Sequence, residues 1–330
     1  MRRSVNYLRI FVAVIAFIWV FNTGITQPAV KGKKIETGST IYPVEEYKHY
    51  DYYALDYIKD LFYYPRFSLS SLPNSPAKAK EAKVNIYTFK VTEKEDDGKM
   101  CLDIFRSGKK VRSDCADSNT RAIVMKPVPG TDINGDGVPE VIVYHYGNGA
   151  HCCFTYTIFS LGKNLKIVDV LHGEHSYFDF KDLDGDGQYE AIGRDWIFAY
   201  WNTSFAGSPA PSVILRWKNG KYRLAEDLMK KPPPEKKEIL KLAAELKKYV
   251  EVDQNPQLPW IPEWWAVMIK LIYTGNGKLA WEFCDLSWPV PEEKSSRKKY
   301  LKEKKMFLAE FKQQLRKSNY WADLKKMNGW

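Results

Sequence analysis

Residues 132–146 read DINGDGVPEVIVYHY, and residues 182–196 read DLDGDGQYEAIGRDW. In both stretches, acidic side chains alternate with other residues around two glycines, and a run with apolar character follows directly. The second copy begins 50 residues after the first. An acidic turn that leads into a predicted strand twice in one chain indicates a repeated structural unit, and the surrounding fold has to accommodate both copies.

The region around these two stretches consists of short apolar runs that are bounded by Gly, Asn, Asp or Pro. Runs of this length, with turn residues between them, are typical of antiparallel β structure of the sandwich or propeller type. They therefore predict a mainly β region. The runs lie at 84–91, 100–105, 121–128, 140–146, 152–161, 165–173, 176–183, 189–201 and 212–225.

The sequence on either side of the β region has helical character. Residues 45–64 carry aromatic and aliphatic side chains at three- and four-residue spacing, which predicts an amphipathic helix. Residues 232–250 open on prolines and continue with a Leu/Ile/Ala stripe, which predicts a second helix. The last forty residues predict one or two more. We expect these helices to pack against the β region, because isolated helices of this length are marginal in water.

The first 27 residues have the pattern of an export signal. A basic start is followed by twelve apolar residues at 10–21, fewer than the roughly 20 that a membrane-spanning helix needs. A cleaved signal peptide and an uncleaved anchor both stay open, and either predicts a protein exported to the periplasm, the cell surface or the extracellular space. The predicted divisions are a signal peptide or N-terminal anchor (1–27), a linker and amphipathic helix (28–83), the β domain (84–228) and a helical, Pro- and Trp-containing region (229–330).

The formal net charge of +10 is concentrated toward the ends of the chain. The C-terminal runs KKPPPEKKEILK (230–241) and SSRKKYLKEKK (295–305) contain acidic residues at helical spacing. This arrangement is typical of a solvated helix face rather than of a nucleic-acid surface. The sequence therefore predicts no nucleic-acid partner, and an anionic membrane or cell-wall polymer is the alternative partner for the basic residues.

The chain has five cysteines. Cys101 and Cys115 flank a predicted hairpin with its tip at 107–109, and a three-residue loop there places the two cysteines directly opposite each other. Opposed residues in an antiparallel pair have Cα atoms about 4.5–5.5 Å apart, within the range of disulfides, so a Cys101–Cys115 bond is predicted. Three arrangements stay open for the others: a bond between Cys152 and Cys153, a bridge from one of them to Cys284, and free buried thiols.

Aligned on their first aspartate, the two acidic stretches fit the pattern D-x-[DN]-x-D-G-x-x-E. A calcium ion takes about six to eight oxygen ligands. This spacing offers side-chain oxygens at places one, three, five and nine and a main-chain carbonyl at place seven, and the glycine at place six permits the tight turn. The predicted ligands are Asp132, Asn134, Asp136, Val138 and Glu140 in the first loop, and Asp182, Asp184, Asp186, Gln188 and Glu190 in the second.

Two further points narrow the metal prediction. An EF-hand needs a glutamate at place twelve and helices on both sides, whereas Val143 and Gly193 occupy place twelve and strands follow. Magnesium demands stricter octahedral geometry than this set suggests, so Ca²⁺ is the predicted cofactor. The second loop has four carboxylates and the first has three, so we predict tighter binding in the second.

The loop pattern and its context SYFDFKDLDGDG (176–187) resemble the FG-GAP or VCBS-type repeat, known from β-propeller domains such as integrin α heads and from many exported bacterial proteins. The resemblance covers roughly 120–225. It implies a loop that joins two strands of a propeller blade and holds a structural calcium ion. Two recognisable copies fall short of the about four to eight blades of a closed propeller. The expected fold is therefore a partial or degenerate β-propeller-like antiparallel domain with C-terminal helices.

Other residues have both a functional and a structural interpretation. His172 and His175 suit a metal site or a surface turn, and a tryptophan cluster suits sugar stacking, a membrane interface or the core. The members of this cluster are Trp260, Trp264 and Trp265.

The sequence favours a calcium-stabilised binding or scaffold module with an unidentified protein or glycan partner over an enzyme. The enzyme alternative is an exported hydrolase or redox protein that uses His151 with Cys152 or Cys153. A third alternative is an interaction protein tethered to a membrane through its N-terminus.

Overall fold

Within the predicted helix at 45–64, a 3-10 turn η4 (Asp56–Ile58) leads into α2 (Lys59–Phe62). The rest of that helix, the export signal or anchor, the linker, His151 and Trp260 lie outside the described residues. The computed structural model describes residues 56–62, 81–94, 99–115, 120–125, 130–147, 152–175, 177–252, 261–290 and 293–330.

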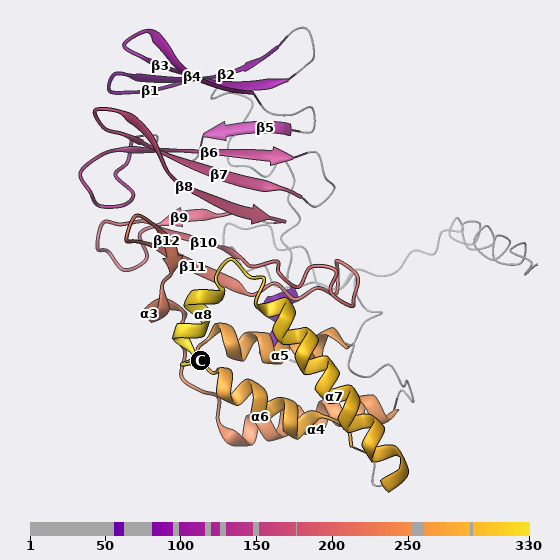
Figure 1. Cartoon of the computed structure of the whole chain (residues 1–330). Helices are drawn as coiled ribbons and strands as arrows, with labels where there is room; N and C mark the ends of the chain where they lie inside the picture. Colours follow the sequence, from indigo (N-terminus) through magenta and orange to yellow (C-terminus); the bar gives the residue numbers. More distant parts are fainter. Residues whose placement is uncertain are drawn as a thin grey trace, which may run out of the picture. The chain divides into compact units, whose positions relative to one another are not determined.

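The described strands form three four-stranded antiparallel sheets, each built from four strands that follow one another in the chain (Figure 1). The first sheet contains β1 (Glu81–Val84), β2 (Tyr87–Glu93), β3 (Met100–Arg106) and β4 (Lys109–Cys115). The second contains β5 (Thr120–Met125), β6 (Glu140–Gly147), β7 (Phe154–Leu161) and β8 (Leu165–Glu174). The third contains β9 (Asp179–Lys181), β10 (Glu190–Arg194), β11 (Ser212–Lys218) and β12 (Lys221–Leu224).

This arrangement confirms the coarser form of the predicted fold class, which is antiparallel β structure with C-terminal helices. The described strands do not close into a barrel or a propeller. The helices that follow the third sheet are α3 (Glu226–Met229), α4 (Lys236–Val252), α5 (Pro262–Tyr273), α6 (Gly277–Ser287), α7 (Lys294–Leu315) and α8 (Trp321–Met327). None of the described helices is long and apolar enough to span a bilayer.

Three of the predicted strand runs are wrong in detail because turns interrupt them. Asn85 (φ 53°) breaks the run at 84–91, and Asn219 with Gly220 (φ 53° and 82°) makes the tight turn between β11 and β12. Positive φ at both central residues is the geometry that matches the twist of paired strands. The run at 189–201 stops at Arg194, because the Asp195 carboxylate accepts the Ile197 N–H (3.0 Å) and the chain turns.

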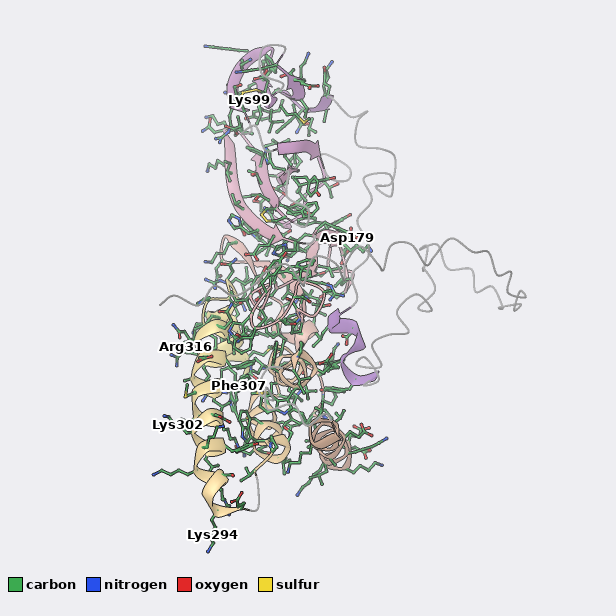
Figure 2. The ribbon with its side chains drawn as sticks, turned by 90° about the vertical axis from the view of Figure 1, so that its right-hand side faces the viewer. Lys99, Asp179, Lys294, Lys302, Phe307 and Arg316 are labelled. Carbon is green, nitrogen blue, oxygen red and sulfur yellow. A yellow bond between two sulfur atoms is a disulfide. The ribbon has the colours of Figure 1, made fainter. Side chains whose placement is uncertain are left out.

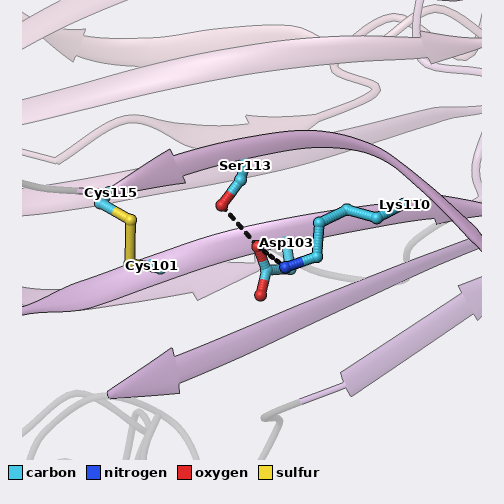
Figure 3. The surroundings of a disulfide bond; sticks show 5 residues. All are labelled: Cys101, Asp103, Lys110, Ser113 and Cys115. Carbon is cyan, nitrogen blue, oxygen red and sulfur yellow. Dashed lines mark hydrogen bonds and ion pairs between the residues drawn. A yellow bond between two sulfur atoms is a disulfide. The ribbon is translucent and has the colours of Figure 1, made fainter. Parts of the chain in front are cut away.

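The register predicted for the cysteine hairpin is confirmed, although it arises by a different local route. The tip is a two-residue turn at Ser107 and Gly108 (φ 47° and 81°) rather than a three-residue loop. A bulge in β4 then adds the missing residue, so Cys101 still faces Cys115 and the two are bonded. Next to the disulfide, the Ser113 hydroxyl donates to Asp103 (Figure 3).

The other cysteines resolve the alternatives that the sequence left open. Cys152 and Cys153 are bonded to each other just before β7. Cys284 is free and buried in α6, so a bridge between Cys284 and either of the others is wrong.

Two apolar clusters connect the sheets and the helices. The smaller cluster joins the first and second sheets through side chains such as Phe89 and Phe159, whose rings are 5.8 Å apart. The larger cluster joins the second and third sheets to the helices. The second and third sheets therefore share one core with the C-terminal helices, as expected for helices that cannot stand alone.

Aromatic side chains form the contact between α7 and its neighbours. Phe307 packs against Trp264 of α5 with 4.9 Å between ring centroids, and Phe311 packs against Phe198 at 5.1 Å. In Figure 2, Phe307 points toward the other helices, whereas Lys302 points away from them. The predicted helix at 232–250 is confirmed as α4, and those in the last forty residues as α7 and α8.

A buried carboxyl group ties the helices to the end of the third sheet. Asp195, which directly follows β10, accepts hydrogen bonds from the hydroxyl groups of Tyr273 (2.6 Å) and Ser318 (2.5 Å). Burial raises the pKa of Asp195, and these hydrogen bonds oppose the shift. Because buried polar groups are costly to leave unpaired, this triad fixes where α5 and the α7–α8 turn meet the sheet.

Thiol counting tests the cysteine arrangement. In denaturant without reductant, we expect one reactive thiol per chain, from Cys284, and five after reduction. In the native protein the buried Cys284 should react slowly or not at all. Three or five reactive thiols in the unreduced, denatured chain would contradict the two bonds.

Glu263 in α5 gives the fold a pH dependence. Its side chain is buried, its Oε2 has no hydrogen-bond partner within the described part of the chain, and burial raises its pKa from 4.5 to about 7. Between these values the folded protein holds a proton that the unfolded chain releases, so this group lowers the free energy of unfolding as the pH rises. We expect Glu263→Gln to stabilise the protein near pH 8 by about 1–3 kcal/mol.

Urea unfolding near pH 5 and near pH 8 checks this expectation. The exposed Glu282 of α6 provides the control, because Glu282→Gln removes the same charge without changing a buried group. Equal pH dependence in wild type and in Glu263→Gln would show that Glu263 does not titrate in the folded protein.

Candidate metal centre

The two acidic loops occupy equivalent positions in consecutive sheets. The first connects β5 to β6 and the second connects β9 to β10, so each joins the first and second strands of its sheet. In the first sheet the corresponding connection consists of only Asn85 and Ile86. The three sheets therefore share one strand order, but among them only the second and third have the acidic loop.

In the first loop, aspartate side chains hold the backbone in its turn. Asp132 accepts the N–H groups of Gly135 and Gly137, each at 2.8 Å, and Asp136 accepts the N–H of Val138 at 2.8 Å. Such bonds from an Asp to a residue two or more positions ahead are a known reason why aspartate favours turns. Both glycines have positive φ (75° and 83°), a conformation that glycine adopts without strain.

The second loop repeats this pattern residue for residue. Asp182 accepts the N–H groups of Gly185 (2.7 Å) and Gly187 (3.1 Å), and Asp186 accepts the N–H of Gln188 (2.8 Å). The φ angles of its glycines are 78° and 89°. The two loops therefore share both their sequence pattern and their backbone geometry.

The glutamate at place nine closes each loop. Glu140 Oε2 accepts the N–H of Ile133 at 3.0 Å, and Glu190 Oε2 accepts the N–H of Leu183 at 2.9 Å. Each glutamate is the first residue of its strand and is almost fully buried, with exposed fractions of 2% and 0%. The carboxylate thereby joins the start of the loop to the start of the strand.

The residues that face these glutamates across the sheet differ between the two loops. Glu140 on β6 faces Ser160 on β7. The register of β10 with β11 places Arg216 opposite Glu190. Arg216 Nε donates to Glu190 Oε1 at 2.8 Å, Nη2 donates to Asp184 Oδ2, and Nη1 donates to Asp227 at 3.0 Å.

The described residues place no such cation at the first loop. Within the described residues, Asp132, Asp136 and Glu140 form no ion pair with a lysine or an arginine. Burial, together with the nearby carboxylates of Asp136 and Asp132, raises the pKa of Glu140 to about 7, while hydrogen bonds from Ile133 and Ser160 oppose the shift. The loop therefore concentrates negative charge without an internal counter-charge.

The two loops lie next to each other. Tyr189 of the second loop donates its N–H to the carbonyl of Ile133 in the first at 2.9 Å, and the Tyr222 hydroxyl donates to the Tyr189 carbonyl at 3.0 Å. Burial raises the pKa of Tyr222, and the carboxylates of both Glu140 and Glu190 contribute. The electrostatic fields of the two loops therefore overlap at this tyrosine.

In the second loop, three of the four predicted carboxylate ligands lie close enough to share a cation, and Asp186 is not among them. Asp182, Asp184 and Glu190 each bring one oxygen to within 4.8 Å of the others. Two oxygens on one Ca²⁺ lie at most about 5 Å apart, since each sits about 2.3–2.6 Å from the ion. The three carboxylates of the first loop do not meet this distance in the described structure, where the side-chain amide of Asn134 at place three donates to Glu140 Oε1 at 3.2 Å.

Other candidate residues from the sequence do not form a site in the described structure. His172 lies exposed on β8. His175 packs among aromatic rings, at 5.2 Å from Trp196 and 5.0 Å from Phe205. Trp264 and Trp265 are buried, which confirms the core interpretation for these two members of the tryptophan cluster.

Sequence reasoning missed Arg216 and Ser160. Arg216 lies in the apolar run SVILRWK, 26 residues after Glu190. A signal was present, since a charged residue at a half-buried strand position calls for a charged partner. Assigning that partner needs the strand register, which the intervening turns at 195–211 conceal.

Comparisons with known proteins show similarity to two proteins, each over only part of the chain. No protein-family profile matches the chain, and no solved structure matches it. The chain is 33% identical over 96 residues to a probable thylakoid lumen protein of Synechocystis sp., across 27% of this chain and 28% of that protein. It is 30% identical over 79 residues to an uncharacterized protein of Sinorhizobium fredii, across 24% of this chain and 12% of that protein. The chain thus spans less than a third of either relative.

The different partners of the two glutamates lead to a prediction that needs no metal. With chelator present near pH 8, we expect Glu190→Gln to lower the free energy of unfolding by about 2–3 kcal/mol, because it removes the charge that Arg216 pairs with. Glu140→Gln should change it by less than about 1 kcal/mol, because no described cation pairs with Glu140 and the glutamine oxygen can still accept the N–H of Ile133. Urea unfolding measures both. Equal losses would contradict the assigned contacts.

Proposed function

We propose that this protein is an exported calcium-binding repeat protein whose β sheets present a binding or scaffolding surface. The observation that carries the proposal is the recurrence of one loop, with the same hydrogen bonds and the same acidic places, at the same position of two consecutive sheets. A recurring loop that gathers three or four carboxylates needs a counter-charge. A calcium ion would provide it and would fix the strands on either side.

The donor set supports calcium as the ion. Asp132, Asn134, Asp136 and Glu140 would supply side-chain oxygens in the first loop, and Val138 would supply its carbonyl. The corresponding ligands of the second loop are Asp182, Asp184, Asp186, Gln188 and Glu190. All are hard oxygen ligands, which suit calcium rather than zinc. Because the hydrogen bonds already hold both turns, the ion would bind a largely formed loop.

The sheet order supports the propeller-like part of the proposal. Three four-stranded meanders in chain order are what three propeller blades would provide, with the acidic loop between the first and second strand of a blade. In this interpretation the first sheet is a degenerate blade, since Asn85 and Ile86 replace its loop. In place of further blades, the C-terminal helices pack against the segment between β10 and β11 of the third sheet, through contacts such as Phe311 with Phe198.

Three observations support export. The N-terminal pattern at 10–21 is that of an export signal. The Cys101–Cys115 bond belongs to an oxidising compartment. One relative is described as a probable thylakoid lumen protein.

The partner is proposed to be a protein or a glycan. The bond between Cys152 and Cys153 leaves neither with a thiol for nucleophilic attack, which counts against the hydrolase alternative.

Calcium binding tests the function directly. We expect chelator to lower the melting temperature of the full chain, and calcium to restore it, because ligand binding to the folded state stabilises it. In calorimetric titrations, Asp136→Asn and Asp186→Asn should each remove or weaken one site, because asparagine keeps the hydrogen bond to the backbone but loses the charge.

Asp179→Asn is the matched control. It removes one carboxylate three residues before the second loop, where Asp179 pairs with Lys181 rather than with a loop residue. This variant should titrate like wild type. A melting temperature that does not respond to calcium or chelator, with no heat of binding, would end the proposal.

A further inference from the structure

We infer that Arg216 is a built-in competitor of calcium in the second loop, and that Ser160 leaves the first loop without one. The inference rests on the proposed function, which it deepens by naming the residue that sets the calcium affinity of each loop. It starts from a contact: one guanidinium binds two of the side chains that calcium would need, Asp184 and Glu190.

The position of Arg216 makes it an effective competitor. Its side chain is 22% exposed and Glu190 is fully buried, so their bond at 2.8 Å is shielded from water. The planar guanidinium donates from Nε and Nη2 to two different carboxylates, a geometry that lysine cannot reproduce. Calcium must therefore displace Arg216 from Glu190 and Asp184, or bind with fewer ligands.

The charge of the two loops leads to the same conclusion. The second loop has four carboxylates and one bound arginine, which leaves three net negative charges. The first loop has three carboxylates and, among the described residues, no bound cation, which gives the same net charge. The greater number of acidic residues in the second loop then gives it no electrostatic advantage, and the expectation from sequence that it binds tighter loses its basis.

Arg216 also has a third partner, which lies outside the loop. Its third bond, from Nη1 to Asp227 at 3.0 Å, runs to a carboxylate that is 64% exposed and lies outside the loop. An arginine released by calcium can keep this partner while it leaves the other two. Displacement would therefore leave its charge paired at the surface.

The experiment compares Arg216→Ser with wild type in an Asp136→Asn background, in which the second loop is the intact one. Arg216→Ser gives the second loop the residue that the first loop has. We expect its calcium affinity in titration calorimetry to rise by about tenfold or more, because two charge-assisted bonds no longer compete. The reciprocal variant, Ser160→Arg in an Asp186→Asn background, should weaken the first loop by a similar factor.

Arg223→Ser is the matched control. Arg223 on β12 lies opposite Arg216 on β11 and pairs with Asp323 rather than with a loop residue. The Arg223→Ser variant therefore removes the same charge as Arg216→Ser but leaves the contacts to the loop in place. Its calcium affinity should stay within about twofold of the background, since surface charge acts weakly at a distance.

The titrations have three outcomes, which distinguish failure of this inference from failure of the proposed function. A rise for Arg216→Ser and not for Arg223→Ser supports the inference. Unchanged affinity in Arg216→Ser, or an equal rise in both, overturns it while calcium binding itself still stands. Absence of binding in wild type and in every variant overturns the proposed function.

Because Arg216→Ser leaves Glu190 unpaired, its melting temperature without calcium should fall and its calcium-induced increase should exceed that of wild type. If that variant does not fold, Arg216→Gln retains a hydrogen-bond donor without the charge and should also bind calcium more tightly than wild type.

Discussion

A buried glutamate at the first position of a strand holds each acidic loop in place. Glu140 and Glu190 accept a backbone N–H from the start of the loop, so the turn and the strand cannot move independently. A buried carboxylate is stable only when its charge is balanced. In the second loop Arg216 provides that balance, and in the first loop no described side chain does. The chemistry of both loops follows from this requirement.

The same constraint relates the loops to the rest of the fold. Each loop leads directly into the second strand of its sheet, so the conformation of the loop also fixes where that strand begins. The bond from Tyr189 to Ile133 makes the two loops a continuous structure. Beyond the third sheet, Asp195 receives hydroxyl groups from Tyr273 and Ser318. Buried carboxyl groups that accept specific hydrogen bonds thus position both the loops and the helices.

Much of the local structure could be predicted from the sequence. The alternation of Asp and Gly in 132–140 and 182–190 predicts the two turns, because aspartate bonds to the backbone ahead of it and glycine tolerates positive φ. The Cys101–Cys115 register was predictable, although the bulge that produces it was not. Residues Asn85 and 195–201 were misassigned to strands because apolar content hides turns. The partner of Glu190 was not predictable, since Arg216 reaches it only through the pairing of β10 with β11.

The most direct test of this account is a crystal structure of the full chain grown with millimolar calcium, with anomalous scattering used to locate the ions. We expect an ion in each loop, bound by the side chains at places one, three, five and nine and by the carbonyls of Val138 and Gln188. In the second loop Arg216 should have left Glu190 for Asp227. Two ordered loops without an ion, with Arg216 still on Glu190, would contradict it.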